Sequence, residues 1–61
     1  MNTFSEALDH LKAGGKAKRE LVKNSSFIQE YKKRLYHNVE DVRASYVPTN
    51  SDLMAEDWIL F

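Results

Sequence analysis

Two neighbouring cations and one aromatic side chain are the residues best suited to hold a charged organic ligand. Lys18 and Arg19 are adjacent, and ammonium and guanidinium groups bind phosphate well. Tyr46 offers an aromatic face on which a nucleobase can stack. Each residue also has a structural interpretation. Lys18 and Arg19 could be solvated strand cations or partners of the acidic carboxyl end, and Tyr46 could belong to the core of a sheet.

A second group of candidates lies where a short helix is expected to begin. Thr49 and Asn50 follow Pro48, and free backbone N–H groups at a helix start can point towards an anion. Thr49 is followed three residues later by Asp52, which is the capping-box pattern and favours a capping role for the hydroxyl. Asp52 could accept a hydrogen bond from a base or a ribose hydroxyl, and helping to cap the helix is an equally good account.

Catalytic and metal-binding patterns find little support. The sequence has no cysteine, no Gly-rich phosphate loop and no H-E-x-x-H motif, and it has no Ser-His-Asp order in a suitable context. Asp41, Asp52 and Asp57 could form a carboxylate pair only through the fold. The two histidines, His10 and His37, are too few for a structural zinc site. We therefore expect no enzyme, no metal and no cofactor.

The 61 residues predict a single small domain spanning residues 1–61. A chain of this length buries only about 60% of its unfolded surface, so we expect copies to associate into a homo-oligomer, a dimer or a tetramer. The zero net charge argues against a nucleic-acid coat protein, and we expect no DNA partner. The sequence has no signal peptide and no membrane-spanning run, which predicts a cytoplasmic protein with no membrane partner.

The first element is a helix over residues 3–13. Thr3 and Glu6 form a capping box, and Gly14 with Gly15 can end the helix because glycine accepts left-handed backbone. The apolar residues fall at i, i+3, i+4 and i+7 on one stripe, Phe4, Ala7, Leu8 and Leu11. His10 lies off that stripe and is expected at the surface.

The middle of the chain is ambiguous. Residues 16–22 fit either a strand or a poorly patterned helix, and residues 23–26 form a polar break of turn formers. In residues 27–46, apolar side chains at spacings of three and four slightly favour a long helix. The alternative is a hairpin of strands 27–31 and 35–38, followed by a third strand in which Val42, Ala44 and Tyr46 point inward. Frequent aromatic and β-branched residues favour that alternative, and the absence of an Asn-Gly or Asp-Gly turn weakens it.

The carboxyl end predicts a short helix followed by an apolar strand. Leu53, Met54 and Ala55 supply apolar surface, and Trp58 begins the run Trp-Ile-Leu-Phe. Such a run has to be covered by the protein's own sheet or by another subunit, so Trp58 is expected in a core. Asp57 is expected to order the loop or to pair with a nearby cation.

Two motifs resemble the phage and prophage family of the second Thoeris anti-defence protein. Residues 4–20, FSEALDHLKAGGKAKRE, resemble its amino-terminal signature of a capped helix F-x-E-A-L-x-x-L-K-x-G-K and a basic strand ending in Arg. Residues 46–58, YVPTNSDLMAEDW, resemble its pattern W-x-P-S-x-x-D-L-L-A-x-D-W. The chain departs from these patterns at Val22, where the family commonly has a tryptophan, and at Tyr46, which replaces the tryptophan of W-x-P. Both are positions where a base can stack, so the loss of an aromatic ring there suggests a changed or absent ligand.

The resemblance implies an α+β fold with the amino-terminal helix packed on a small antiparallel sheet and a short helix before the last strand. It also implies a homo-oligomeric sponge that holds cyclic nucleotide-type immune signals between subunits without cleaving them. Such signals are a cyclic ADP-ribose isomer or cyclic oligonucleotides, and the defence systems concerned are Thoeris and CBASS. The candidate ligand-binding residues are Lys18, Arg19, Tyr46, Thr49, Asn50 and Asp52.

A different class of function stays open. The exposed cations Lys32, Lys33 and Arg34, together with the apolar tail, could instead cover a surface of a host protein. Recovery of a stoichiometric protein partner without a small molecule would favour this alternative.

Overall fold

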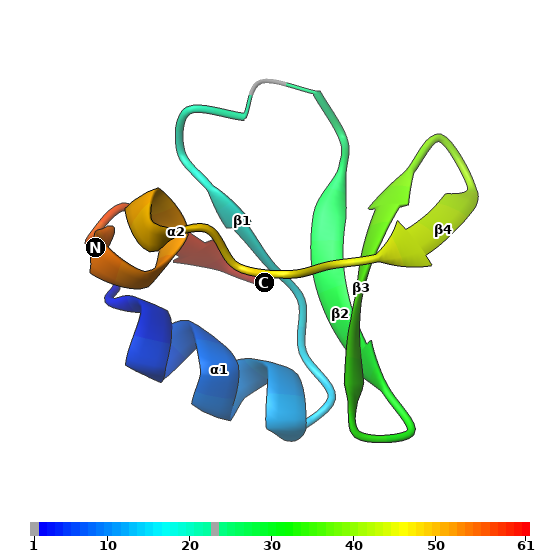
Figure 1. The fold of residues 1–61 in the computed structure, drawn as a ribbon, viewed down its shortest axis with the longest axis horizontal. Helices are drawn as coiled ribbons and strands as arrows, with labels where there is room; N and C mark the ends of the chain where they lie inside the picture. Colours follow the sequence, from blue (N-terminus) through cyan, green and yellow to red (C-terminus); the bar gives the residue numbers. More distant parts are fainter. Residues whose placement is uncertain (1, 23) are drawn as a thin grey trace.

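The computed structural model describes residues 2–22 and 24–61, and within them the chain forms two helices and a five-stranded antiparallel sheet (Figure 1). The elements in chain order are α1 (Phe4–Lys12), β1 (Ala17–Arg19), β2 (Phe27–Tyr31), β3 (Arg34–Val39), β4 (Val42–Ser45), α2 (Asn50–Met54) and β5 (Trp58–Leu60). The expected α+β class, the packed amino-terminal helix and the short helix before the last strand are confirmed. Neither helix is long and apolar enough to cross a membrane.

The strands lie in the order β4-β3-β2-β1-β5, so the last strand of the chain pairs with the first. The contact between β1 and β5 runs over three residue pairs, whereas β1 and β2 share only the pair Ala17 and Ile28. Beyond that pair, β1 and β2 diverge. This gap on the otherwise continuous sheet is what creates the site described below.

The helix α1 forms as its sequence predicts. The Thr3 hydroxyl accepts a hydrogen bond from the Glu6 backbone N–H, and the Glu6 carboxylate accepts one from the Thr3 backbone. Gly14, with φ of 96°, supplies the left-handed residue that ends the helix. His10 lies at the surface, and its Nε2 atom lies 2.9 Å from the carbonyl oxygen of Phe61, so it holds α1 to the end of the chain.

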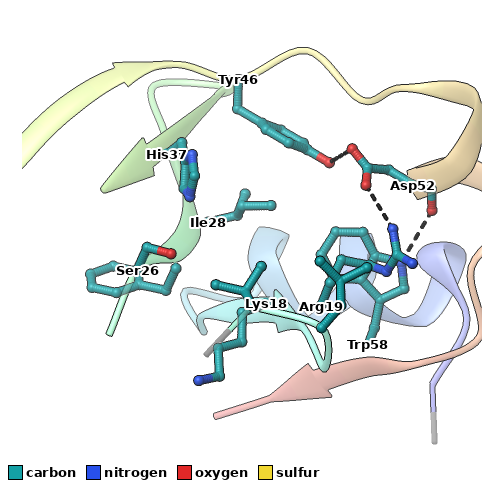
Figure 2. A pocket seen from close by; sticks show the side chains of 11 residues that line it. Lys18, Arg19, Ser26, Ile28, His37, Tyr46, Asp52 and Trp58 are labelled. Carbon is teal, nitrogen blue, oxygen red and sulfur yellow. Dashed lines mark hydrogen bonds and ion pairs between the residues drawn. The ribbon is translucent and has the colours of Figure 1, made fainter. Parts of the chain in front are cut away.

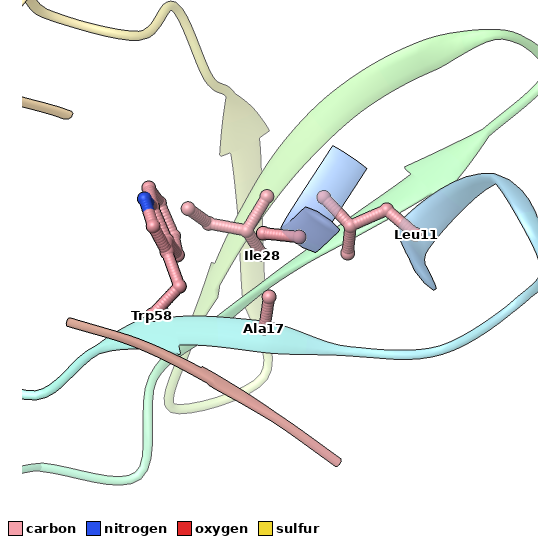
Figure 3. Packing of buried hydrophobic residues seen from close by; sticks show 5 residues of the cluster. Leu11, Ala17, Ile28 and Trp58 are labelled. Carbon is pink, nitrogen blue, oxygen red and sulfur yellow. The ribbon is translucent and has the colours of Figure 1, made fainter. Parts of the chain in front are cut away.

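The core is a small apolar cluster between α1 and the strands β1, β2 and β5. Its buried members are Ala7, Leu11, Ala17, Ile28 and Trp58. Figure 3 shows Ile28 between Trp58 and Leu11, with Ala17 beneath it. The Phe4 ring packs edge-on against Trp58 at 5.6 Å between centroids. The prediction that Trp58 is a core residue is therefore confirmed, and the protein's own sheet and helix provide its cover.

The slight preference for a helix over residues 27–46 is wrong, because these residues form β2, β3 and β4. The two hairpin turns explain why the sequence pattern gave too little weight to the strands. Lys32 and Lys33 in one turn, and Glu40 and Asp41 in the other, have positive φ angles between 49° and 67°. Two-residue hairpins require this left-handed backbone, usually from Gly or Asn, and here charged residues adopt it.

The third strand of the hairpin alternative exists, but its side chains do not point into a core. All four residues of β4 are exposed, and Val42 is 67% exposed. The helix α1 packs on β1, β2 and β5 and does not reach β4, so nothing in the described chain covers this strand. Among its expected inward residues, only Tyr46, just beyond the strand, packs against the core cluster.

Residues 16–22 resolve as a short strand and a turn. Ala17 is buried and Arg19 shares its face of the sheet, but Leu21 lies beyond the strand and is exposed. In the polar break 23–26, Lys23 lies outside the described residues. Asn24 and Ser25 form a bend, and the Asn24 side chain accepts a hydrogen bond from the Ser26 backbone. This bend carries the chain from β1 to β2 and leaves the gap between them open.

Candidate functional site

A pocket opens where β1 and β2 diverge, and the segment from Tyr46 to α2 passes over it (Figure 2). Its volume is about 170 Å³. The lining side chains come from all parts of the chain: Lys18, Arg19, Leu21, Val22, Ser26, Phe27, Ile28, His37, Tyr46, Asp52 and Trp58. Most of this wall is apolar or aromatic, and its ionisable groups gather at one end.

One end of the pocket is formed by an arginine held between two carboxylates. The Nη1 atom of Arg19 donates to Asp52 Oδ1 at 2.9 Å, and its Nε atom donates to Asp57 Oδ1. The Arg19 side chain is 13% exposed and that of Asp52 is 17% exposed, so the pair is largely desolvated. The guanidinium carbon lies 6.0 Å from the centre of the Trp58 ring. The hydrogen bond to Asp57 and then that to Asp52 raise the pKa of Arg19 above its ordinary value.

Asp52 is the centre of this network. Its Oδ2 atom accepts from the Tyr46 hydroxyl at 2.8 Å and from the Thr49 backbone at 3.1 Å, while Oδ1 serves Arg19. Burial opposes ionisation of the carboxyl. The hydrogen bonds from Thr49, Tyr46 and Arg19 outweigh this effect, and the pKa of Asp52 lies below its ordinary value. The site therefore holds a fixed carboxylate at neutral pH.

Tyr46 closes the opposite side of the pocket. Figure 2 shows its ring spanning from the end of β4 towards Asp52, with His37 beside it. The His37 ring meets it edge-on, with centroids 6.3 Å apart. Burial, followed by the hydrogen bond to Asp52, raises the pKa of the Tyr46 hydroxyl above its ordinary value. The phenol is thus a neutral hydrogen-bond donor whose orientation is set by Asp52.

Lys18 is the other cation of the wall, and its environment differs from that of Arg19. Its Nζ atom donates to the carbonyl oxygen of Asn24 at 3.3 Å and has no carboxylate partner among the described residues. Figure 2 shows this amino group directed away from Asp52. Of the two adjacent cations, Lys18 is therefore the one whose charge is not already matched by a carboxylate.

The structure brings four of the six expected ligand-binding residues to this pocket, namely Lys18, Arg19, Tyr46 and Asp52. Thr49 and Asn50 lie outside its lining, at the start of α2. The Thr49 hydroxyl accepts from the Asp52 backbone N–H, and the Thr49 backbone N–H donates to the Asp52 carboxylate. This capping box therefore uses the Thr49 backbone N–H that was expected to face a ligand.

Several lining residues were not among the expected set. Ser26, just before β2, and His37, on β3, both line the pocket. They lie close together because Ile28 pairs with His37 in the sheet, which the sequence alone does not show. Val22 does carry a sequence signal. Val22 and Tyr46, the two positions at which the chain departs from the family's aromatic pattern, both line the same pocket.

A second pocket is unsuited to an anion. It has a volume of about 340 Å³ and is lined by Ser25, Phe27, Asn38, Glu40 and Asp41, which include two carboxylates and no cation. Among the residues that the structure describes, no group of three or more histidine, cysteine or acidic side chains could hold a metal ion. The pocket at the divergence of β1 and β2 is therefore the better candidate.

The family model of the Tad2-like domain, described as the Thoeris anti-defense 2-like domain, matches residues 2–61. A search of curated proteins found no match.

Proposed function

Because the chain belongs to the Thoeris anti-defense 2-like family, we propose that it binds and sequesters a cyclic nucleotide-type immune signal without cleaving it. The observation that carries this proposal is the pocket lined by Lys18, Tyr46 and the Arg19–Asp52 pair, with the amino group of Lys18 directed away from Asp52 (Figure 2). An aromatic face, an unmatched cation and a fixed carboxylate suit a base, a phosphate and a ribose or base donor respectively. Sequestration needs only such groups.

The proposed roles of the two cations differ. Arg19 already donates to Asp52 and Asp57, so a phosphate would have to displace a carboxylate to reach it. Lys18 has no such competitor, and we assign the phosphate contact to it. Arg19 then acts as a positioning residue, since it fixes the Asp52 carboxylate that accepts a hydrogen bond from the ligand. This assignment gives the adjacent pair two separate tasks.

The remaining expected residues have narrower roles in the proposal. Tyr46 presents its ring to the base, and His37 supports that ring from the side. Thr49 holds Asp52 through the capping box and has no free N–H to offer. Asn50, at the rim of the site, would contact only a part of the ligand that projects beyond the pocket.

The size of the pocket supports association between copies. Ligand pockets usually measure about 300–1,000 Å³, so a volume of about 170 Å³ holds one ring system rather than a whole cyclic nucleotide. The segment that covers the pocket carries exposed apolar side chains, with Val47 at 79% and Met54 at 82% exposed. We propose that a second copy packs on this segment and completes the site, giving a dimer or a tetramer.

A binding experiment with a panel of signals tests the proposal. Purified protein is titrated calorimetrically with cyclic ADP-ribose isomers, cyclic dinucleotides and cyclic trinucleotides, then heated so that released molecules can be identified by mass spectrometry. We expect binding of at least one compound and its recovery unchanged. Absence of binding across the panel by folded protein, or recovery of a cleaved product, contradicts the proposal.

Matched variants connect the binding to this pocket. Lys18→Ala and Tyr46→Leu are expected to weaken binding by at least about tenfold, because they remove the proposed phosphate and stacking contacts. Lys12→Ala removes a cation from the far end of α1 and serves as the control. Equal losses in Lys18→Ala and Lys12→Ala would mean that only the overall charge matters.

Occlusion of a host protein is the weaker alternative. It requires an exposed apolar tail together with the cations Lys32, Lys33 and Arg34. Ile59 and Phe61 of that tail are exposed, but Trp58, its largest side chain, is buried in the core. A stoichiometric protein recovered from host lysate, with no small molecule bound, would reverse this preference.

A further inference from the structure

The strands present aromatic and basic side chains on the face of the sheet opposite α1, and the carboxylates of Glu40 and Asp41, in the turn after β3, border this face beside Phe27 and Asn38. Alternation along the strands places Phe27, Tyr31 and Tyr36 on this face, because Ile28 and its cross-strand partner His37 point towards the other. In the described strands β1–β5, no Asp or Glu falls on it. We call it the open face, since α1 packs on the opposite side of β1, β2 and β5.

One end of the open face is a cluster built on an arginine. The Arg43 guanidinium carbon lies 4.9 Å from the Tyr31 ring centre and 5.1 Å from that of Tyr36. The two rings meet edge-on at 6.5 Å, and Tyr31 is 48% exposed. Arg34 lies opposite Tyr31 in the register of β2 and β3. Rings and cations are therefore prearranged on adjacent strands.

The other end repeats this combination with different residues. Lys16 Nζ lies 4.7 Å from the centre of the Phe27 ring, and Phe27 meets Phe61 edge-on at 6.2 Å. Phe61 is 54% exposed. Phe27 and Tyr31 are four residues apart on β2, which separates the two clusters by roughly 13 Å along the strand. Two aromatic–cation clusters thus lie in line on one uncovered surface.

We propose that the open face binds single-stranded nucleic acid. Unpaired bases stack on aromatic side chains regardless of sequence, and lysine and arginine track the phosphates between them. The zero net charge of the chain, which led us to expect no DNA partner, conceals this surface because no acidic residue lies on it within the strands, and Glu40 and Asp41 only border it. Charge complementarity selects a polyanion as the occupant.

A second copy is a poorer occupant of the same surface. In a two-fold interface the same patch meets itself, so the cations Lys16, Arg34 and Arg43 of one copy would face those of the other, with carboxylates only at the border of the face. The segment near Val47 and Met54, proposed above for association between copies, leads away from β4 to α2 and is separate from this face. Both surfaces can therefore be tested independently.

The test is fluorescence anisotropy with labelled 12-nucleotide strands of deoxythymidine and of uridine. Saturable binding of at least one strand is expected, weakening by about tenfold or more between 50 and 200 mM salt if three phosphates are contacted. A duplex of equal length should bind more weakly, because its bases are already stacked. Failure of folded protein to bind either strand, or tighter binding of the duplex, overturns the proposal.

Variants separate stacking from charge. Tyr36→Leu and Arg43→Ala are expected to weaken strand binding by about 5- to 100-fold, whereas Tyr36→Phe keeps the ring and should bind like the parent. Lys12→Ala on α1 is the charge control, and circular dichroism with gel filtration establishes the fold and the mass of each variant. Unchanged binding by Tyr36→Leu and Arg43→Ala overturns the proposal. It is also overturned if no strand binds the parent protein and gel filtration shows that Tyr36→Leu has lost an association between copies. Tyr46→Leu, which alters the pocket, should bind the strands as the parent does. Strand binding can therefore be judged even if the proposed sequestration of a cyclic nucleotide fails.

Discussion

The two helices begin with the same kind of capping box, yet only the box of α2 makes hydrogen bonds to residues outside its own helix start. Thr3 with Glu6 and Thr49 with Asp52 both form a threonine–acid capping box with reciprocal hydrogen bonds. Within the described residues, the Glu6 carboxylate accepts hydrogen bonds only from Thr3, and the group is exposed. The Asp52 carboxylate caps α2 and also accepts from Arg19 and Tyr46.

This difference shows how a local motif acquires a long-range role. A glutamate on the exposed start of α1 reaches only its own cap. Asp52 is shorter, lies on the segment that crosses the pocket, and is largely desolvated. Its capping bond fixes one oxygen and leaves the other for Arg19 from β1. The second box therefore joins α2, β1 and the end of β4, whereas the first only starts a helix.

The largest expected effect comes from removing the two acids separately. Asp52→Ala should lower the free energy of unfolding by about 2–3 kcal/mol, because it breaks a largely buried ion pair and strips the Tyr46 hydroxyl of its acceptor. Glu6→Ala should cost much less, because its carboxylate is fully exposed to solvent and bonds only to its own cap. Urea denaturation at one temperature measures both. Asp52→Asn provides a second variant if the alanine form does not fold, and equal costs at the two positions would break the comparison.

The pH dependence of stability should follow the same difference. The folded-state pKa of Asp52 lies below its ordinary value, so its contribution is complete above about pH 4 and is lost as the pH falls through the folded-state pKa. The unfolding midpoint of the parent protein should therefore drop steeply below about pH 4. Asp52→Asn should flatten this drop more than Glu6→Gln. The Glu6 carboxyl of the parent also has a lowered pKa, but it is fully exposed to solvent. An identical profile in the parent and in Asp52→Asn would contradict the prediction.

Removal of the Tyr46 hydroxyl is expected to have a smaller effect. Tyr46→Phe loses one hydrogen bond to a charged group, with an expected cost of about 1.5 kcal/mol or less. Tyr31→Phe is the matched control, because the Tyr31 hydroxyl makes no hydrogen bond with the residues that the structure describes and the residue is half exposed. Thermal unfolding of the two variants gives the comparison. A larger loss in Tyr31→Phe would show that Asp52 is not the acceptor that matters.

The smallest difference is expected between the two threonines. Thr3→Ala and Thr49→Ala each remove one hydroxyl that accepts from a backbone N–H, at a typical cost of about 1 kcal/mol. The two losses in the free energy of unfolding should agree within about 0.5 kcal/mol, because each hydroxyl accepts one hydrogen bond from a backbone N–H in the first turn of its helix. A much larger cost at Thr49 would mean that the box as a whole, and not Asp52 alone, holds the network together.

Features determined by neighbouring residues were accessible from the sequence. Both capping boxes, the glycine that ends α1 and the burial of Trp58 follow from short patterns, and the structure confirms them. The resemblance added the sheet and the order of its elements. The pairing of Asp57 with a cation was also expected, and that cation is Arg19.

The rest depended on pairing that no local pattern encodes. Ile28 and Tyr31 are spaced like residues on one side of a helix, yet in β2 they point to opposite faces. The partner of Arg19 is an acid 33 residues later, brought near only because β5 returns beside β1. For the same reason, the contributions of Ser26 and His37 to the pocket could not be predicted from spacing.

The turns at Lys32–Lys33 and Glu40–Asp41 have a practical consequence for anyone who works with this protein. Each places like-charged side chains next to one another on backbone that glycine and asparagine tolerate better. Neither turn lines the pocket at the divergence of β1 and β2. Substitutions at these turns, for example Lys33→Gly, should therefore raise the free energy of unfolding without changing the pocket. In such a background, pocket variants that lose stability would still fold.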